Sequence, residues 1–310
     1  MELIEEKNKI DGLGRANEIK QQLAFLISGL KIKPNIAIIQ VGNNPSSNIY
    51  IRQKIKIAQQ IGITVKHIHL DEETTEEKLL KIIKETNDDK SIDGMIVQLP
   101  LPDHIDKFNV LSAIFPNKDL DGLHPFNAGL LHYSQIVPYC VNKVLMNEFS
   151  KQELKNLGKT IGIIPCTPLG CLDLLQHECE TLIGKNAVVI GNSNLVGRPI
   201  SRLLIQSGAT TATIHSKSKN TDYLISNADI IVSATGVGQT IKKIKPNAII
   251  IDVAIRYNKE QKLCGDLDYN ELIKTNRITP VPKGVGPMTV ACLMVNSYLC
   301  CLRNHLDLID

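Results

Sequence analysis

The sequence predicts an α/β protein of two domains, of which the second is a doubly wound, Rossmann-like nucleotide domain. Its 310 residues are enough for about two domains. Short apolar runs alternate with helical patterns along most of the chain, which favours parallel sheets covered by helices. Residues 184–199, GKNAVVIGNSNLVGRP, have the order strand, glycine turn and helix start that is typical of a nucleotide domain.

The first part of the chain predicts helices and strands in alternation. Apolar side chains recur at helical spacing in three segments, and apolar runs of strand length lie between them. The helical segments are residues 14–30, 46–61 and 76–84, and the strand segments are residues 35–41, 63–70 and 94–99. We therefore expect a parallel sheet with helices on its faces.

The middle of the chain is less regular. Residues 118–125, KDLDGLHP, predict a loop after a short helix, and residues 127–164 mix polar and apolar positions without a clear period. We expect part of this second segment to be helical and part to be a surface excursion. A helix should then begin near residue 165 and continue through Leu175, with Pro168 in its first turn.

The nucleotide domain is predicted from four buried strands joined by short helical crossovers. The strands cover residues 186–190, 210–215, 228–234 and 247–255, and the helices cover residues 197–206 and 222–227. Gly191 and Gly197 bound a turn whose backbone N–H groups and helix dipole suit a phosphate. Because these two glycines lack the common dinucleotide spacing, an ordinary strand-to-helix turn stays an alternative.

The end of the second strand of this domain bears on the choice of cofactor. A domain that prefers NAD usually carries Asp or Glu there for the ribose hydroxyls, but residues 215–219 read HSKSK. A carboxylate would repel a 2′-phosphate, whereas a hydroxyl and cations accept it. This pattern favours NADP, and the alternative is that these are solvated loop residues.

Composition and charge argue against several kinds of partner and cellular location. The formal net charge of +3 is too small to argue for nucleic acid or an anionic membrane as a partner. The N-terminus is charged from its second residue, so we expect no secretory signal, and the most apolar stretch, residues 288–302, is too short to span a bilayer. Eight cysteines lack C-x-x-C pairs and Cys/His ligand spacing, so we expect free thiols, no metal and a cytoplasmic protein.

Four polar residues are candidates for chemistry. Tyr50 and Lys54 lie one helical turn apart, hence on one side of a helix. Gln98 lies at the carboxyl end of a strand, where α/β sheets bind ligands, and Asp121 lies in a loop beside a glycine. Each also has an ordinary interpretation: the lysine as a surface residue, the aspartate as a cap or turn residue.

Seven segments together resemble the bifunctional methylenetetrahydrofolate dehydrogenase/methenyltetrahydrofolate cyclohydrolase (FolD) family. They occur in the family's order and extend over nearly the whole chain. The segments are IDG at 10–12, SSNIYIRQKIKIAQQIGI at 46–63, GMIVQLPLP at 94–102, KDLDGLHPFNAG at 118–129, PCTPLG at 165–170, GKNAVVIGNSNLVGRP at 184–199 and PVPKGVGPMTVA at 280–291.

The resemblance implies two reactions of one-carbon folate metabolism, which serves purine biosynthesis. In the first, 5,10-methylenetetrahydrofolate gives a hydride to NADP+ and becomes the methenyl cation, a step that positioning alone can promote. In the second, water adds to the methenyl carbon and the ring opens to 10-formyltetrahydrofolate. The second step needs proton transfer, for which Lys54 is the candidate.

The resemblance also implies roles for the candidate substrate residues. Tyr50 would stack on the folate and orient Lys54, Gln98 would hydrogen-bond Lys54, and Asp121 would accept hydrogen bonds from the pterin. The predicted catalytic residues are Lys54, Tyr50, Gln98 and Asp121, and the predicted folate-binding set is Tyr50, Lys54, Gln98, Leu99, Asp121, Gly286 and Pro287.

For the cofactor, the resemblance assigns the phosphates to the glycine turn, the 2′-phosphate to Ser216 and the nicotinamide to Ile255. The full predicted set is Gly191, Asn192, Ser193, Val196, Gly197, Arg198, His215, Ser216, Thr235, Gly236 and Ile255.

Similar proteins have a catalytic domain and a Rossmann-like NADP-binding domain with a cleft between them, and form homodimers through the latter. Here the catalytic domain is predicted over residues 1–140, completed by a terminal helix over 287–310. The nucleotide domain is predicted over residues 141–286.

Four features depart from the family pattern. Asn192 lies where many relatives carry Arg, Lys283 replaces a glycine, and Ala254-Ile255-Arg256 replaces Gly-Ile-Asn. The segment between Asn127 and Pro165 is longer than the family pattern, as functional or mobile loops often are. Asn192 keeps open a monofunctional, NAD-linked dehydrogenase, and a non-catalytic nucleotide-binding relative is the alternative from a different class.

Overall fold

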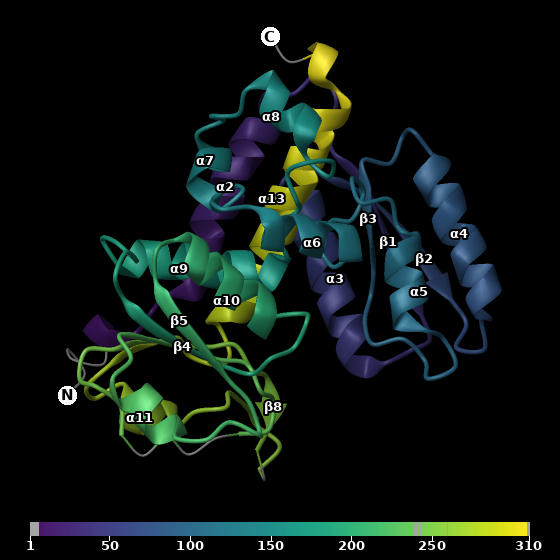
Figure 1. Ribbon diagram of the computed structural model, residues 1–310. Helices are drawn as coiled ribbons and strands as arrows, with labels where there is room; N and C mark the ends of the chain where they lie inside the picture. The colour runs from purple at the N-terminus through teal and green to yellow at the C-terminus, as the bar shows by residue number, and fades with distance from the viewer. Residues whose placement is uncertain (1–5, 239–240, 242, 259, 309–310) are drawn as a thin grey trace. The chain divides into compact units, whose positions relative to one another are not determined.

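The computed structural model describes residues 6–238, 241, 243–258 and 260–308 (Figure 1). Residues 1–5, which belong to the charged start that argued against a secretory signal, lie outside the described residues. The chain divides into two compact units. Unit 1 takes its residues from Met1–Glu18, Gln135–Val137 and Thr167–Cys292, and unit 2 takes its residues from Ile19–Ser134, Pro138–Cys166 and Leu293–Asp310.

These bounds differ from the predicted domains in the middle of the chain and towards its two ends, because residues 1–18 and 287–292, predicted in the catalytic domain, belong to unit 1. The sequence assigned residues 141–286 to the nucleotide domain, whereas the structure groups Pro138–Cys166 with unit 2. The reason is tertiary packing, because buried polar side chains of this segment hydrogen-bond with other residues of unit 2, as described below.

Unit 2 is built on a three-stranded parallel sheet with the strand order β2-β1-β3. The strands are β1 (Asn35–Val41), β2 (Thr64–Leu70) and β3 (Gly94–Val97). Its helices are α3 (Pro45–Gln60), α4 (Glu76–Asp88), α5 (Lys107–Ala113), α6 (Pro125–Tyr133), α7 (Val141–Leu145) and α8 (Lys151–Asn156). The predicted alternation of helices and strands is confirmed, and the irregular segment 127–164 contains most of α6 and all of α7 and α8.

Local sequence explains the boundaries of the helices that flank this sheet. Asn44 caps α3 by accepting a hydrogen bond from the Ser47 N–H, and Pro45 follows at the first helical position. Thr75 caps α4 in the same way. Leu79 and Ile83, four residues apart on α4, are fully buried and pack in one core cluster with residues of β1 and β3.

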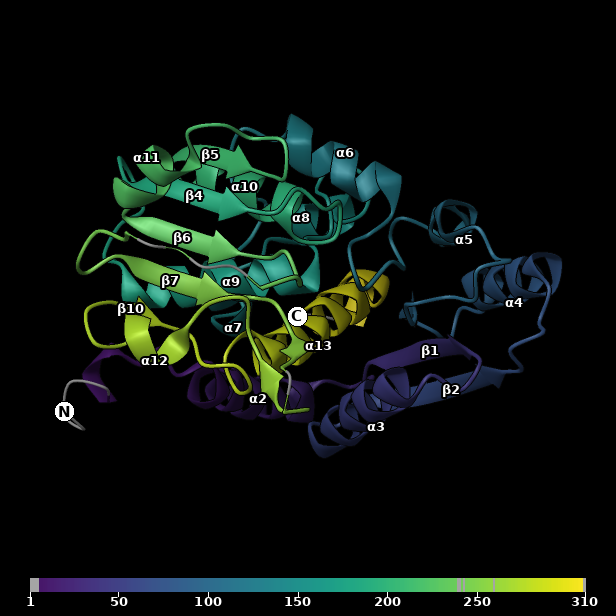
Figure 2. The same cartoon turned by 90° about the horizontal axis from the view of Figure 1, so that it is seen from below.

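Unit 1 contains a five-stranded parallel sheet with the order β10-β7-β6-β4-β5 (Figure 2). The strands are β4 (Asn186–Ile190), β5 (Thr210–Ile214), β6 (Ile230–Ser233), β7 (Ile249–Asp252) and β10 (Arg277–Ile278). The helices are α9 (Cys166–Glu178), α10 (Gly197–Gln206), α11 (Thr221–Ser226) and α12 (Tyr269–Leu272). A short antiparallel hairpin joins β8 (Arg256–Tyr257) and β9 (Leu263–Cys264).

The order of these strands confirms a doubly wound sheet, and four details of the structure differ from the prediction. β5 is an edge strand and only its last residue is buried, so it is not a buried strand as predicted. In the connection from β6 to β7, the described residues 234–238, 241 and 243–248 form no helix. The fourth strand is shorter than predicted, and β10 and the hairpin, of two residues per strand, were not predicted.

Two long helices, α2 (Gly12–Gly29) and α13 (Val285–Asn304), each have residues in both units. The apolar stretch was expected to be too short to span a bilayer, but α13 is longer than that stretch, and by length and composition it could cross a membrane. In the protein, 83% of its most apolar window is buried. Asn296 and Ser297, which interrupt the apolar run, are buried and hydrogen-bonded, and Ser297 Oγ donates to the Leu293 carbonyl. The burial is that of a central core helix.

Candidate functional site

In unit 2 a lysine is buried beside the carboxyl end of the sheet. Lys54, on α3, is only 8% exposed, and its Nζ lies 3.0 Å from Gln98 Oε1. Gln98 directly follows β3, and its Nε2 donates to the Leu99 carbonyl at 2.6 Å, which leaves Oε1 to accept from the lysine. The predicted hydrogen bond is present, and the burial excludes the interpretation of Lys54 as a surface residue.

The neighbours of Lys54 on α3 explain why this face is buried. Ile51 and Ala58 are buried on the same helix, so the lysine is part of the face that packs inward. Tyr50, one turn before Lys54, is half-buried. Ser47 Oγ lies 3.5 Å from the Leu99 carbonyl, so α3 and the segment after β3 approach each other along this face.

Asp121 lies in a loop that pairs with the free edge of β3. The Met95 N–H donates to the Lys118 carbonyl at 2.7 Å, and the Leu120 N–H donates to the Met95 carbonyl at 3.1 Å, which makes a parallel bridge. Because parallel strands have their carboxyl ends on the same side of a sheet, Asp121 and Gln98 both lie at the carboxyl end of this sheet. Asp121 is half-buried.

A buried polar network that no local sequence pattern predicts fixes this loop. Asn296 Nδ2 donates to the carbonyls of Leu120 and Ile164, at 2.8 and 3.0 Å. Tyr139 Oη donates to Asn296 Oδ1 at 2.8 Å and accepts from the Ile164 N–H at 2.8 Å. Tyr139 belongs to the long segment 127–164, so this part of the insertion supports the loop that carries Asp121.

Asp119, in the same loop, is a buried carboxylate and is only 1% exposed. Asp119 Oδ2 accepts hydrogen bonds from the His124 N–H at 2.7 Å and from Asn127 Nδ2 at 3.0 Å. Burial outweighs these bonds and raises the pKa of Asp119 to about 6. Its neighbour Asp121, not Asp119, was the predicted ligand residue, and the structure gives Asp119 a role in shaping the loop.

In unit 1 the candidate nucleotide residues follow the strands at the point where the strand order reverses. The chain leaves β4 for β5 on one side and returns to β6 on the other, and such switch points form ligand crevices in open α/β sheets. Gly191 directly follows β4, Thr235 and Gly236 follow β6, and Ile255, 45% exposed, follows β7.

The turn after β4 needs its two glycines for space. A Cβ on Gly191, whose φ is +118°, would lie 2.5 Å from the Ala234 carbonyl oxygen. A Cβ on Gly197 would lie 2.1 Å from the Gly191 carbonyl oxygen. The backbone of this turn therefore packs closely against itself and against the loop after β6, as a phosphate-binding turn requires.

Side chains complete this turn. Ser193 Oγ accepts hydrogen bonds from the N–H groups of Val196 and Gly197, at 3.2 and 3.4 Å. The Arg198 guanidinium donates to the side-chain oxygens of Asn192 and Asn194, at 3.1 and 2.9 Å. Asn192 thus holds an exposed cation over the turn, and the chemistry of this donor set fits an anionic group.

The loop after β5 exposes further donors. His215, Ser216 and Lys217 are exposed, and the loop is closed by a hydrogen bond from the His215 N–H to Ser218 Oγ at 3.0 Å. Since β5 pairs with β4 in parallel, this loop and the glycine turn both lie at the carboxyl ends of the strands. The exposed hydroxyl and cations fit a 2′-phosphate.

Gly286 and Pro287, the remaining predicted folate residues, lie half-buried in the first turn of α13 and belong to unit 1. Two departures from the family pattern have structural consequences nearby. Lys283 has a φ of +81°, a left-handed conformation that favours glycine. Arg256 Nε donates to the Gly265 carbonyl at 2.7 Å, and Ala254 is buried.

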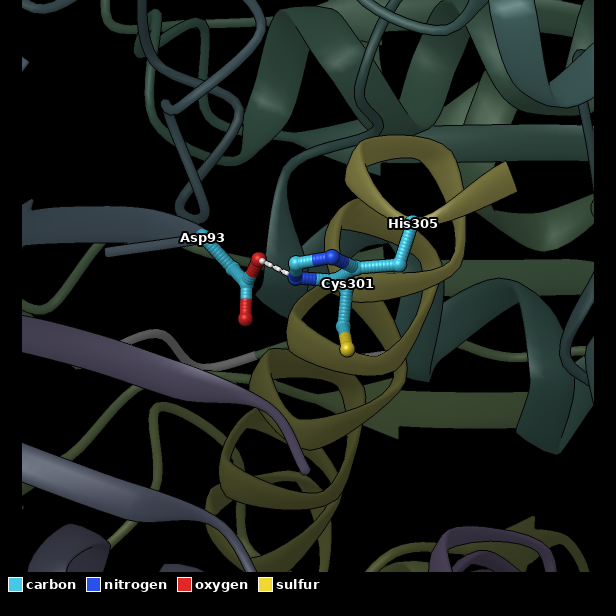
Figure 3. Close-up of side chains that lie close together, drawn as sticks. All are labelled: Asp93, Cys301 and His305. Carbon is cyan, nitrogen blue, oxygen red and sulfur yellow. Dashed lines mark ion pairs between the residues drawn. The ribbon is translucent and has the colours of Figure 1, made fainter. Parts of the chain in front are cut away.

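One group of side chains has the composition of a metal site. Ligand atoms of Asp93, Cys301 and His305 lie within 4.8 Å of one another, with His305 Nε2 3.2 Å from Asp93 Oδ1 (Figure 3). The carboxylate also accepts hydrogen bonds from the Asn35 N–H and from Asn304 Nδ2, each at 2.9 Å. Both carboxylate oxygens therefore have protein donors, and the group is a cluster of polar side chains that joins the end of α13 to the start of β3. Residue spacing could not reveal it, because Asp93 is far from the other two in sequence.

Comparison with known proteins agrees with this geometry. The chain is 42% identical over 297 residues to the bifunctional protein FolD of Rickettsia bellii, which covers 94% of this chain and 96% of the relative. The structure of FolD methylenetetrahydrofolate dehydrogenase/cyclohydrolase from Campylobacter jejuni is 38% identical, covers 94% of this chain and 97% of its own, and gives a TM-score of 0.83. The dehydrogenase-cyclohydrolase of Trypanosoma brucei, solved with NADP and an inhibitor, is 30% identical, covers 94% and 96%, and gives a TM-score of 0.79.

Both halves of the chain match domains of one family. Residues 10–121 match the catalytic domain of tetrahydrofolate dehydrogenase/cyclohydrolase, and residues 165–305 match its NAD(P)-binding domain. The chain belongs to the tetrahydrofolate dehydrogenase/cyclohydrolase family.

Proposed function

We propose that this protein is a bifunctional enzyme that oxidises 5,10-methylenetetrahydrofolate with NADP+ and hydrolyses the methenyl product to 10-formyltetrahydrofolate. Family membership gives the reaction pair. The observation that carries the hydrolytic half is the buried Lys54, with its Nζ 3.0 Å from Gln98 Oε1. A nucleotide-binding relative without turnover would not need to keep a buried amine at this place.

For the hydrolysis, unit 2 supplies the groups that act on protons. We assign to Lys54 the transfer of a proton between the attacking water and the folate. Gln98 fixes the position of Lys54 Nζ, because the amide of Gln98 is itself held by the Leu99 carbonyl. Tyr50 offers an aromatic face to the pterin, and Asp121 offers two oxygens to its N–H groups.

For the oxidation, unit 1 supplies binding and orientation. NADP+ accepts the hydride when it is bound. The glycine turn with Ser193 would hold the phosphates, and Thr235, Gly236 and Ile255 would position the nicotinamide end. This step needs no general base, because the product is a cation and no proton is lost.

The preference for NADP over NAD is supported by charge. Residues 215–219 offer hydroxyls, two lysines and no carboxylate. Arg198 adds a cation over the neighbouring turn, held by Asn192 and Asn194. Steady-state kinetics with both cofactors test this assignment, and a clear preference for NAD would contradict it.

We further propose that the enzyme is a cytoplasmic homodimer whose partners are tetrahydrofolate derivatives, and that its 10-formyl product serves purine biosynthesis. Family membership supports these proposals. Light scattering of the purified protein tests the dimer.

The deciding experiment follows methenyltetrahydrofolate alone with the purified protein. Enzyme-dependent loss of the methenyl absorbance over a no-enzyme blank is the expected result. A folded protein that gives no decay but reduces NADP+ with the methylene substrate would be a monofunctional dehydrogenase. A protein with neither activity would be a non-catalytic relative.

A further inference from the structure

One buried carboxylate collects the hydrogen bonds of the loop that follows β6. Asp266 is 1% exposed, and its Oδ2 accepts from the N–H and Oγ1 of Thr235 at 2.8 and 2.7 Å, and from Ser233 Oγ at 3.1 Å. Oδ2 also accepts from the Gly236 N–H at 3.2 Å, and Oδ1 from the Gly238 N–H at 3.0 Å. A single side chain thus sets the backbone of residues 235–238.

Asp266 is itself held by the neighbouring strand. Its N–H donates to Asp252 Oδ1 at 3.1 Å, and the Leu267 N–H donates to Asp252 Oδ2 at 2.9 Å. Asp252 is the last residue of β7, and a Cβ on Gly265 would lie 2.1 Å from its Oδ2. The support is therefore continuous from the rigid sheet through two carboxylates to the loop.

The negative charge of Asp266 strengthens its hydrogen bonds to the loop. Burial opposes its ionisation, but hydrogen bonds from Thr235, Gly238 and Gly236 outweigh burial and hold the pKa of Asp266 below its usual value. The bonds to the ionised carboxylate are charge-assisted and stronger than neutral ones. An asparagine of the same shape would lose this charge and would turn an N–H group toward other N–H donors.

The supported loop lies at the candidate nucleotide site. Ala234, at its start, is the residue whose carbonyl approaches Gly191, so the loop and the glycine turn share one close contact. Thr235 and Gly236 are the predicted cofactor residues that follow β6.

We propose that Asp266 is a positioning residue for the dinucleotide: it fixes the 235–238 loop in its binding conformation without contacting the cofactor. This inference rests on the proposed function, because it concerns the same nucleotide site. Sequence analysis missed Asp266 because no local pattern links it to a loop about 30 residues earlier.

A matched pair of variants tests the inference. Asp266→Asn removes the charge at the carboxyl end of β6. Asp229→Asn removes a charge at the amino end of β6, where the Asp229 carboxylate accepts hydrogen bonds from the Asn186 N–H and from Lys245. Isothermal titration with NADP+ should give a dissociation constant raised about tenfold or more for Asp266→Asn. Asp229→Asn should stay within about twofold of wild type.

Two further readouts separate positioning from general damage. The rate and KM of methenyltetrahydrofolate hydrolysis should be unchanged in Asp266→Asn, while the KM for NADP+ rises. If Asp266→Asn does not fold, Ser233→Ala, which removes only one bond to Asp266, should weaken NADP+ binding in the same direction by a smaller factor.

Unchanged NADP+ affinity in folded Asp266→Asn, or in Ser233→Ala where Asp266→Asn does not fold, would overturn the inference while leaving the proposed function intact. Failure of the wild-type protein to bind NADP+ would overturn the proposed function, and the inference with it.

Discussion

Both units place their candidate site at the carboxyl ends of a parallel sheet, but they build it from different materials. In unit 2 the site depends on side chains, with a buried amine on α3 and an amide after β3. In unit 1 it depends on the backbone, with glycines that permit a close turn and a carboxylate that holds the next loop. Removal of the lysine amine should therefore disable the first site, whereas a methyl group added to the glycine turn should disable the second.

The first test of this comparison removes the amine of unit 2. Lys54→Ala should lower the rate of methenyltetrahydrofolate hydrolysis by about 10²–10⁴-fold, because proton transfer would lose its positioned group. Folate binding, measured by titration, should be largely kept. Lys56→Ala, an exposed lysine on the same helix, is the control. Hydrolysis by Lys54→Ala at nearly the wild-type rate would refute the proton-transfer role.

The second test adds a methyl group to the backbone site of unit 1. Gly191→Ala should abolish measurable NADP+ binding, because the new Cβ would lie 2.5 Å from the Ala234 carbonyl and φ is +118°. Gly184→Ala is the control: its φ is also positive, at +74°, but nothing lies within 4 Å of the added Cβ. Hydrolysis should persist in both variants. NADP+ binding by Gly191→Ala equal to that of Gly184→Ala would show that close packing of the turn is not required.

The same contrast explains what the sequence could predict. Strands such as β1 and β4 are apolar runs with one consistent local preference, so their existence and type follow from pattern. Lys54 and Gln98 could be paired only through the family resemblance, since nothing local to either residue shows that they meet. The hydrogen bond between them depends on how α3 packs beside β3.

The supports of both sites were not predictable for the same reason. Asn296 reads as a polar interruption of an apolar helix, and its partners Leu120 and Ile164 lie far away in the sequence. Asp266 likewise lies in a segment with no helical or strand period. Buried polar residues become interpretable only when their partners are known, because their cost depends on whether each hydrogen bond is made.

A third prediction concerns a pH dependence of stability that the two units share. Each contains a buried carboxylate, Asp119 in unit 2 and Asp252 in unit 1, whose pKa burial raises to about 6. Between about pH 4 and 6 the folded state keeps protons on these groups that the unfolded state has lost. Their contribution to the free energy of unfolding therefore falls as pH rises through this range, on the order of 3 kcal/mol for each group.

Urea unfolding at pH 4, 5, 6 and 7 checks this pH dependence. Asp119→Asn and Asp252→Asn should each flatten the decrease, whatever their effect on absolute stability. A variant that leaves the slope between pH 4 and 6 as in wild type would show that its carboxylate does not titrate there.

A fourth prediction concerns the long segment 127–164 in unit 2 and the buried network that holds it. Tyr139→Phe removes the donor to Asn296 Oδ1 and the acceptor of the Ile164 N–H, both in a buried environment. Leaving such groups without partners should reduce the free energy of unfolding by about 1–3 kcal/mol. Tyr133→Phe, at a tyrosine 89% exposed in α6, should change little. Equal stability of the two variants would show that the network does not hold the segment.

The smallest effect is expected at Lys283 in unit 1, whose backbone conformation favours glycine. Lys283 has a φ of +81°, and left-handed backbone costs a side-chain-bearing residue about 1–2 kcal/mol. Glycine removes this strain but also loses more entropy on folding, about 0.5–1 kcal/mol, so Lys283→Gly should stabilise the protein by at most about 1.5 kcal/mol. Lys283→Ala removes the same charge and keeps the strain, so it should bring no gain. Thermal unfolding of both variants separates these terms: a gain in Lys283→Ala equal to that in Lys283→Gly would assign the effect to the lost charge, and only a gain confined to glycine would assign it to the backbone.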